Sequence, residues 1–220
     1  MATNIEQARF NMIEQQVRTW DVLDERALDA LKAVPREDFV PSRYRKLAFM
    51  DVRIPLGHEQ VMMKPVEEGR VLQALNLQPG QSVLEIGTGS GFLAACMAYL
   101  GAQVTTLEII PEIAESAMRR LERSETDNVT VIKADGLSLE DLPEGTFDCV
   151  VITGSSAQVP ELLKAKVSVG GCLFAIRGDS PAMEAICMKQ TAIGDWSVDS
   201  LFETDIPRLV GAEDAPTFEF

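Results

Sequence analysis

Hydrophobic positions in the amino-terminal third of the chain recur at helical spacing. Apolar side chains within residues 10–17 lie on one side of a first predicted helix, and a second predicted helix turns Leu28 and Leu31 inward. Pro35 and Pro41 then interrupt helix propagation. We expect an amino-terminal helical extension, with irregular connections between its helices.

From residue 81 onward, short apolar runs alternate with amphipathic helices. This alternation predicts right-handed crossovers and a mostly parallel sheet that is covered on both faces. The predicted strands are Ser82–Ile86, Gln103–Glu108, Asn128–Ile132, Cys149–Thr153 and Gly171–Ile176, and the predicted helices are Phe92–Leu100, Glu112–Arg123 and Val159–Lys166.

The carboxyl-terminal pattern differs, because three β segments follow one another without helices. They are Met183–Gln190, Trp196–Glu203 and Ile206–Val210, and they predict an antiparallel edge on the sheet. We expect one globular unit of the α/β, doubly wound class, with a helical cover segment at 1–66 and a ligand-binding domain at 67–220. The cover segment either only shields one side of the sheet or also closes over the substrate.

Composition narrows the possible functions. The chain has 220 residues, with 46% hydrophobic and 25% charged, which suits one sizeable core. Its 34 acidic and 20 basic residues give a net charge of −14, so nucleic-acid binding is disfavoured. Nothing in the sequence indicates an oligomeric state.

Cysteine usage and hydropathy indicate the compartment. The four cysteines show no C-x-x-C pair and lie in apolar stretches, which favours reduced, buried thiols over a metal or redox site. The amino terminus shows no basic segment followed by a long apolar run, so we expect no leader segment, and no apolar run reaches the roughly 20 residues that a bilayer requires. We expect a cytoplasmic protein that binds neither a metal nor a membrane.

The segment VLEIGTGSGF carries the first sign of a ligand site. A strand ends at Ile86, a glycine-rich turn follows, and a helix begins at Phe92. Glycine allows the sharp turn and a close ligand approach, and the helix start presents free N–H groups. A dinucleotide-binding turn has the spacing G-x-G-x-x-G, and this chain has Phe92 at the position of its last glycine. The predicted cofactor-binding turn comprises Gly87, Thr88, Gly89, Ser90 and Gly91.

Carboxylates at three successive strand ends identify the class of cofactor. Glu85 precedes the turn, Glu108 ends the second strand next to Ile109, and Asp135 and Gly136 follow the third strand. We expect Glu108 to accept hydrogen bonds from both ribose hydroxyls and Asp135 to contact the adenine edge. Acidic groups repel a pyrophosphate but suit a cation. The sequence therefore predicts S-adenosylmethionine as the cofactor.

The order and spacing of six segments match those of a known family. The segments are VPREDFVP, AFMDVRIPLGHEQ, NLQPGQSVLEIGTGSGF, DNVTVIKADG, FDCVVITGSSAQVPELLKAKVSVGGCLFAIRGD and DIPRLVG. In them the chain resembles the protein-L-isoaspartate O-methyltransferases from about Arg9 to Val210. The resemblance implies a Rossmann-like methyltransferase fold and methyl esterification of isoaspartyl residues in damaged proteins. It also implies a protein or peptide as the methyl acceptor.

The segment after IPLG departs from the family pattern. Family members carry a glutamine, a threonine, a hydrophobic residue and a serine, then one further residue before a proline. Gln60 and Pro65 match this frame, but Val61 and Met63 replace the two hydroxyl residues and cannot donate a side-chain hydrogen bond. Met62 and Met63 are expected to form an apolar wall. The family's catalytic residues are not carried over to this segment.

Candidate catalytic residues are His58 and Gln60. Methyl transfer to a carboxylate needs no general base, because the acceptor is already ionised near pH 7. A phenol or amine acceptor needs proton removal, for which His58 is the one side chain that titrates near neutrality. His58 is either such a base beside Glu59 or a loop histidine bonded to the backbone. Lys64 either pairs with an acidic substrate group or is solvated.

Two questions remain open from the sequence alone. The hydroxyls of Thr153, Ser155 and Ser156 either face the acceptor or cap the helix that follows. The altered substrate segment is compatible with isoaspartyl methylation, with a small-molecule or other protein acceptor, and with a protein that binds the cofactor without turnover.

Overall fold

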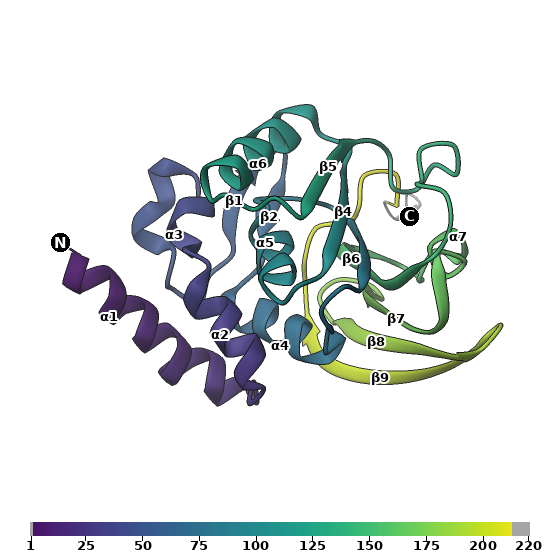
Figure 1. Cartoon of the computed structure of the whole chain (residues 1–220), viewed down its shortest axis with the longest axis horizontal. Coiled ribbons are helices and arrows are strands. Elements are labelled where there is room, and N and C mark those ends of the chain that lie inside the picture. Colours follow the sequence, from purple (N-terminus) through teal and green to yellow (C-terminus); the bar gives the residue numbers. More distant parts are fainter. Residues whose placement is uncertain (1, 213–220) are drawn as a thin grey trace, which may run out of the picture.

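One mixed sheet is covered by several helices on one face and by one short helix on the other (Figure 1). The structure, a computed structural model, describes residues 2–212. The acidic end of the chain, 213–220, lies outside the described residues. The helical elements are α1 (Ala2–Met12), the π-helix η1 (Ile13–Val17), the 3-10 helix η2 (Arg18–Trp20), α2 (Glu25–Ala33), α3 (Arg36–Phe39), the 3-10 helix η3 (Ser42–Leu47), α4 (Pro65–Leu75), α5 (Phe92–Tyr99), α6 (Pro111–Arg123) and α7 (Glu161–Lys164).

The main sheet has seven strands in the order β5-β4-β3-β6-β7-β8-β9. Pairing is parallel from β5 to β7 and antiparallel for β8 and β9, which confirms the predicted sheet and its antiparallel edge. Strand order reverses at β3, where α/β sheets form a ligand crevice at the carboxyl ends of the strands. The strands are β3 (Ser82–Ile86), β4 (Gln103–Glu108), β5 (Val129–Lys133), β6 (Phe147–Ser156), β7 (Val167–Arg177), β8 (Met183–Ala192) and β9 (Asp195–Thr204).

Two buried hydrophobic clusters hold the layers together. The larger one joins α2, α4 and α5 to one face of the sheet through side chains such as Leu31, Leu72 and Met97. The smaller one joins α7 to the other face and includes Leu163 and Ile152. The amino-terminal helices share the larger cluster with the sheet, so they cover one of its faces.

Some elements differ from the sequence-based expectation. The helix expected at Val159–Lys166 is confined to Glu161–Lys164, because Pro160 precedes its first turn. The segment Ile206–Val210 was expected to be a strand, and this is wrong. It runs beside β6 with one isolated parallel bridge, between Ser155 and Arg208.

A two-stranded hairpin in the amino-terminal segment was not predicted. Strands β1 (Ile54–Gly57) and β2 (Gln60–Met62) pair with each other, separately from the main sheet. The residues between them, His58 and Glu59, have φ angles of 51° and 60°. Such turns are usually signalled by Asn-Gly or Asp-Gly, so His-Glu gave no hint of a hairpin.

Helix α4 links the amino-terminal segment to the far edge of the sheet. The boundary expected after residue 66 falls inside this helix, one residue past its start. Glu67 of α4 accepts hydrogen bonds from Arg53 Nη2 at 2.6 Å and from Thr204 Oγ1 of β9 at 2.7 Å. The two predicted parts are therefore joined by a buried polar contact as well as by the shared core.

All four cysteines are free and buried, as the apolar context of each predicted. Within residues 2–212, no helix is long and apolar enough to cross a bilayer.

Candidate active site

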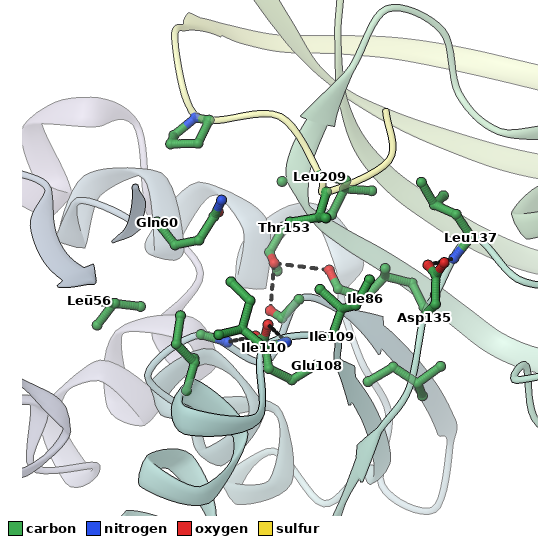
Figure 2. A pocket seen from close by; sticks show the side chains of 18 of the residues that line it. Leu56, Gln60, Ile86, Glu108, Ile109, Ile110, Asp135, Leu137, Thr153 and Leu209 are labelled. Atoms are coloured by element: carbon green, nitrogen blue, oxygen red, sulfur yellow. Dashed lines mark hydrogen bonds between the residues drawn. The ribbon is translucent and has the colours of Figure 1, made fainter. Parts of the chain in front are cut away.

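A cavity opens at the carboxyl ends of β3, β4 and β6, where the strand order reverses (Figure 2). The empty space between its walls, including the open mouth, is about 700 Å³. Its walls come from the glycine-rich turn, the ends of β4 and β5, the hairpin and the carboxyl-terminal segment. The lining residues are Leu56, Gln60, Val61, Met63, Ile86, Gly87, Gly89, Leu107, Glu108, Ile109, Ile110, Ile113, Ala134, Asp135, Gly136, Leu137, Thr153, Gly154, Ile206, Pro207, Leu209 and Val210.

The glycine-rich turn is held from behind by β6. Thr153 Oγ1 donates to the carbonyl oxygens of Ile86 at 3.0 Å and Gly87 at 2.6 Å (Figure 2). Gly87 has a φ of +94°, and a Cβ there would lie 2.4 Å from Thr153 Oγ1. The turn therefore requires glycine for both its conformation and its packing. The Thr153 hydroxyl therefore stabilises the glycine-rich turn and does not cap the following helix.

Gly87→Ala is expected to lower the free energy of unfolding more than Gly145→Ala, by roughly 1–3 kcal/mol. Both glycines have positive φ, at +94° and +81°, so both alanine variants are strained. A Cβ at Gly145 meets no atom within 4 Å, whereas at Gly87 it meets Thr153. Chemical denaturation of the two variants measures the difference. Equal stabilities would show that the close approach to β6 is unimportant.

Glu108 lies at the centre of the cavity wall. Its Oε2 accepts from the Gly89 N–H at 3.0 Å and its Oε1 from the Ile110 N–H at 3.1 Å. Burial raises the pKa of Glu108, and these N–H groups oppose the shift. Each carboxylate oxygen has a second lone pair available for a ligand. The carboxylate is thereby oriented before any ligand arrives.

The far end of the cavity is apolar with one carboxylate. Asp135 Oδ1 accepts from the Leu137 N–H at 2.8 Å. Gly136 lies against Ile86, because a Cβ there would come within 2.4 Å of Ile86 Cγ2. Ile109 and Leu137 add apolar surface (Figure 2). This end suits a flat, mostly apolar ligand group with a hydrogen-bonding edge.

Glu85 does not reach the cavity, contrary to the sequence-based expectation. It is fully buried, and its Oε2 accepts a 2.6 Å hydrogen bond from Thr106 Oγ1. Side chains alternate along a strand, so Ile86 faces the cavity and Glu85 faces away. Burial raises the pKa of Glu85 to about 8. The residue therefore supports the turn from beneath and supplies no exposed charge.

Three other predicted turn residues have supporting positions. Thr88 is buried and its hydroxyl lies 2.7 Å from that of Thr106. Ser90 Oγ accepts from the Phe92 N–H at 3.2 Å. Gly91 precedes α5 with a φ of +84°. These residues shape the turn, and Gly87 and Gly89 form the part that faces the cavity.

The hairpin supplies the wall opposite the sheet. Leu56 and Val61 of the hairpin and Met63, which follows it, line the cavity, whereas Met62 does not; both methionines are buried in the larger core cluster. Gln60 lines the same wall, and Figure 2 shows its amide directed toward the side where Thr153 lies. The amide of Gln60 makes no hydrogen bond to other residues in 2–212 and is available to a ligand.

His58 lies outside the cavity. It occupies the hairpin turn, where its side chain is 48% exposed and its Nε2 is 3.7 Å from Glu112 Oε2. The structure thus brings Gln60 into the site but not His58, so His58 is poorly placed as a general base. Lys64 Nζ is 3.8 Å from Asp51 Oδ2, so this lysine pairs within the protein.

The carboxyl-terminal segment completes the cavity and was missed as part of the site. Ser155 N donates to the Pro207 carbonyl at 3.0 Å, and Leu209 N donates to the Ser155 carbonyl at 2.9 Å. Ile206, Pro207 and Leu209 are thereby held over the cavity mouth. No polar motif marks this segment in the sequence, so only its resemblance to family segments pointed to it.

Arg36 was also missed, because it lies behind the cavity wall. Its fully buried guanidinium donates to the Met63 carbonyl at 2.7 Å and the Ala48 carbonyl at 2.9 Å, and it pairs with Glu68. The Arg36 Cζ atom also lies 4.9 Å from the ring centroid of Phe92. Arg36 therefore connects the hairpin wall to the helix that follows the glycine-rich turn.

The cavity lining has an acidic character. Glu108 and Asp135 are its titratable side chains, and none of the described lining residues is lysine, arginine or histidine. A diphosphate would meet two carboxylates and no cation, whereas a cationic ligand meets a favourable field. The cavity fits a cationic nucleoside better than a dinucleotide.

Comparisons with known proteins agree with this chemistry. The family model described as protein-L-isoaspartate(D-aspartate) O-methyltransferase matches residues 7–195. A protein-L-isoaspartate O-methyltransferase 1 from Rhodopseudomonas palustris (strain HaA2) is 34% identical over 213 residues, which cover 96% of this chain and 86% of the relative. A protein-L-isoaspartate O-methyltransferase from Gloeobacter violaceus is 39% identical over 164 residues, which cover 74% and 79%.

Solved structures share the fold. A Plasmodium falciparum protein crystallised with S-adenosyl-L-homocysteine superposes with a TM-score of 0.78 at 19% identity, covering 90% of this chain and 96% of that one. At this identity the likeness concerns the fold alone, which is the Rossmann-like arrangement expected. The match of the family model and the identity to curated relatives extend over most of the sequence. The chain belongs to the protein-L-isoaspartate(D-aspartate) O-methyltransferase family.

Proposed function

We propose that the protein is an enzyme that uses S-adenosylmethionine to methylate the free carboxylate of isoaspartyl residues in proteins or peptides. The observation that carries this function is the cavity itself. It combines an oriented Glu108, an acidic lining and an acceptor wall without a general base. Family membership supports the same reaction. The free, buried thiols suit a reducing compartment such as the cytoplasm.

The cavity residues fit the cofactor part by part. Glu108 would accept hydrogen bonds from the ribose hydroxyls, and Asp135 would contact the adenine edge between Ile109 and Leu137. The Gly87–Gly91 turn allows the amino-acid end to lie against the backbone. When bound, the cofactor supplies an electrophilic methyl group on a sulfonium. Glu85 takes no direct part and keeps the turn in place from below.

The lining residues support an acceptor that is already ionised. No lysine, histidine, cysteine or tyrosine occurs among the described residues around the cavity. A carboxylate oxygen can attack directly, forming the O–CH3 bond as the S–CH3 bond breaks, with no proton transferred. The products are a methyl ester and S-adenosylhomocysteine. Gln60 orients the acceptor through its free amide, and the apolar hairpin wall excludes water.

A second candidate function is methylation of another acceptor. Val61 and Met63 stand where the family carries hydroxyl residues, and both line the cavity. This apolar wall favours a flat or apolar acceptor over a solvated one. A third possibility, cofactor binding without turnover, is less favoured because Glu108 and Asp135 both remain in the cavity.

One assay distinguishes the three. Purified protein is incubated with methyl-labelled S-adenosylmethionine and an isoaspartyl peptide, with the matching aspartyl peptide as control. The proposed function predicts base-labile label in the isoaspartyl peptide alone. Label that appears only when a cell extract is added indicates another acceptor. Cofactor binding by calorimetry without any labelling indicates a protein that binds without turnover.

Gln60→Ala is expected to lower kcat/KM for the isoaspartyl peptide about 10-fold or more. The variant removes the free amide donor at the acceptor wall, and a hydrogen bond to a charged group contributes about 1.5–3 kcal/mol. Gln103→Ala, an exposed residue at the start of β4, makes the same chemical change elsewhere and should leave kcat/KM unchanged. Equal activity of the two variants would remove Gln60 from the acceptor site.

A further inference from the structure

A trough leads away from the cavity along helix α6. Leu56, Gly89 and Ile113 line both the cavity and a second hollow beneath the hairpin turn. Ser116 and Arg120 line that hollow and also a third one, between α6 and the α3–η3 segment. Each hollow shares lining residues with the next, so the three follow one another along α6, and this row of hollows forms the trough.

One face of α6 forms the floor of this trough. Ile113, Ser116, Arg120 and Arg123 are spaced by three, four and three residues, which places them in a row on the helix. The row begins apolar, at the cavity, and ends with arginines. With a rise of about 1.5 Å per residue, it spans roughly 15 Å. An extended peptide covers that length with about four to five residues.

The far end of the trough is positively charged in a protein whose net charge is −14. Arg119, Arg120 and Arg123 line this hollow, and among the described residues none of them has a carboxylate within 4.0 Å. Burial and its two arginine neighbours lower the pKa of Arg120, which indicates that these cations repel one another. Arg120 Nη1 donates to the Ser90 carbonyl at 3.5 Å, but the three arginines form no ion pair within the described residues.

The acidic residues near these arginines are mostly engaged elsewhere. Glu37 pairs with Arg9 at 2.6 Å, and Asp38 pairs with Arg45. Glu122 remains as the single unpaired carboxylate of the hollow. A basic residue in the last turn of a helix is favourable by itself, but like charges three and four residues apart oppose that gain. An anionic group of a ligand would therefore stabilise the three arginines.

We propose that this trough binds the chain flanking the methyl acceptor and that Arg119, Arg120 and Arg123 recognise an acidic side chain of the substrate four to five residues from the isoaspartyl residue. The proposal rests on the proposed function and specifies its substrate class further. The apolar start of the row accommodates the chain next to the acceptor. The arginines add charge recognition at the end, where a carboxylate replaces the missing counter-charge.

The test uses isoaspartyl peptides that differ only in their flanks. Two glutamates stand four and five residues before the isoaspartyl residue in one peptide, and after it in a second. A third peptide has glutamines at all of these positions. KM and kcat are measured for the intact protein, for Arg119→Gln/Arg123→Gln, and for Lys189→Gln, which removes one exposed charge on β8 as a control.

One acidic peptide is expected to show a KM about fivefold lower than the glutamine peptide, with kcat unchanged, because exposed charge pairs contribute modestly. The preference should vanish in Arg119→Gln/Arg123→Gln, persist in Lys189→Gln and weaken in 0.5 M salt. Equal KM values for all three peptides, or a preference that survives in the double variant, would overturn the proposal.

Binding keeps this test separate from that of the proposed function. Fluorescence anisotropy of the labelled peptides is measured with S-adenosylhomocysteine present, so no turnover is required. Tighter binding of an acidic peptide without methylation of any peptide would support the trough and contradict isoaspartyl methylation. Methylation of all three peptides with equal binding would support the enzyme and contradict the trough.

Discussion

Replacing Arg36 with methionine is expected to lower the free energy of unfolding by about 3–5 kcal/mol, as measured by urea denaturation. The fully buried guanidinium donates to the carbonyls of Ala48 and Met63 and pairs with Glu68. Methionine fills a similar volume but leaves two carbonyl oxygens and a buried carboxyl without a donor. The loss is large because none of these groups can reach water.

The pH dependence identifies the group responsible. Burial raises the pKa of Glu68 to about 8, and Arg36 opposes that shift. In Arg36→Met the pKa in the folded state rises further, while the unfolded value stays near 4.3. A raised folded pKa means that stability is lost as pH rises toward that value. The deficit relative to the intact protein should therefore be larger at pH 9 than at pH 6.

A double variant provides the control for this prediction. Arg36→Met/Glu68→Leu buries neither charge and should recover much of the lost stability. If it is no more stable than Arg36→Met alone, or if the single variant lies within about 1 kcal/mol of the intact protein, the buried pair does not have the structural role assigned here.

Glu108→Ala is expected to raise the Kd for S-adenosylhomocysteine roughly 10- to 100-fold, measured by calorimetry. The carboxylate is held by the N–H groups of Gly89 and Ile110 with lone pairs left for two hydroxyls. Hydrogen bonds to a charged group contribute about 1.5–3 kcal/mol, and each 1.4 kcal/mol corresponds to tenfold in affinity.

Two further variants make this result specific. Glu115→Ala removes a carboxylate from the exposed side of α6, where it pairs with Lys133 at 2.7 Å, and should change the Kd less than twofold. Glu85→Gln replaces a buried carboxyl that does not line the cavity and should change it far less than Glu108→Ala. A Glu85 variant as damaging as the Glu108 variant would restore the direct role expected from the sequence.

The sheet was predictable because its information is local. Strands β3 and β4 have the bounds expected from their apolar runs, and β5 is displaced by one residue. Each of these three runs ends within two residues of a glycine or carboxylate that marks the carboxyl edge of a parallel sheet. The same local signals placed Glu108 and Asp135 in the cavity. The orientation of Glu85 was misjudged, although strand alternation alone would have directed it away from Ile86.

The acceptor side was less predictable because it depends on contacts between distant segments. The hairpin turn at His58 and Glu59 carries no turn signature. Arg36 reaches Met63 and Glu68 only in the folded chain. The carboxyl-terminal segment is positioned by backbone hydrogen bonds with Ser155 and by the Ser155 hydroxyl, which donates to the Ile206 carbonyl at 2.9 Å; these contacts join residues far apart in the sequence. Spacing along the sequence contains none of this information.

The hairpin that forms the acceptor wall pairs only with itself and not with the seven-stranded sheet. Its cavity-facing positions, such as Leu56 and Val61, take part in no strand pairing of the main sheet. Within this architecture, acceptor preference can diversify under selection while nucleoside binding is inherited unchanged. A few substitutions in this one hairpin would then be enough to change the methyl acceptor.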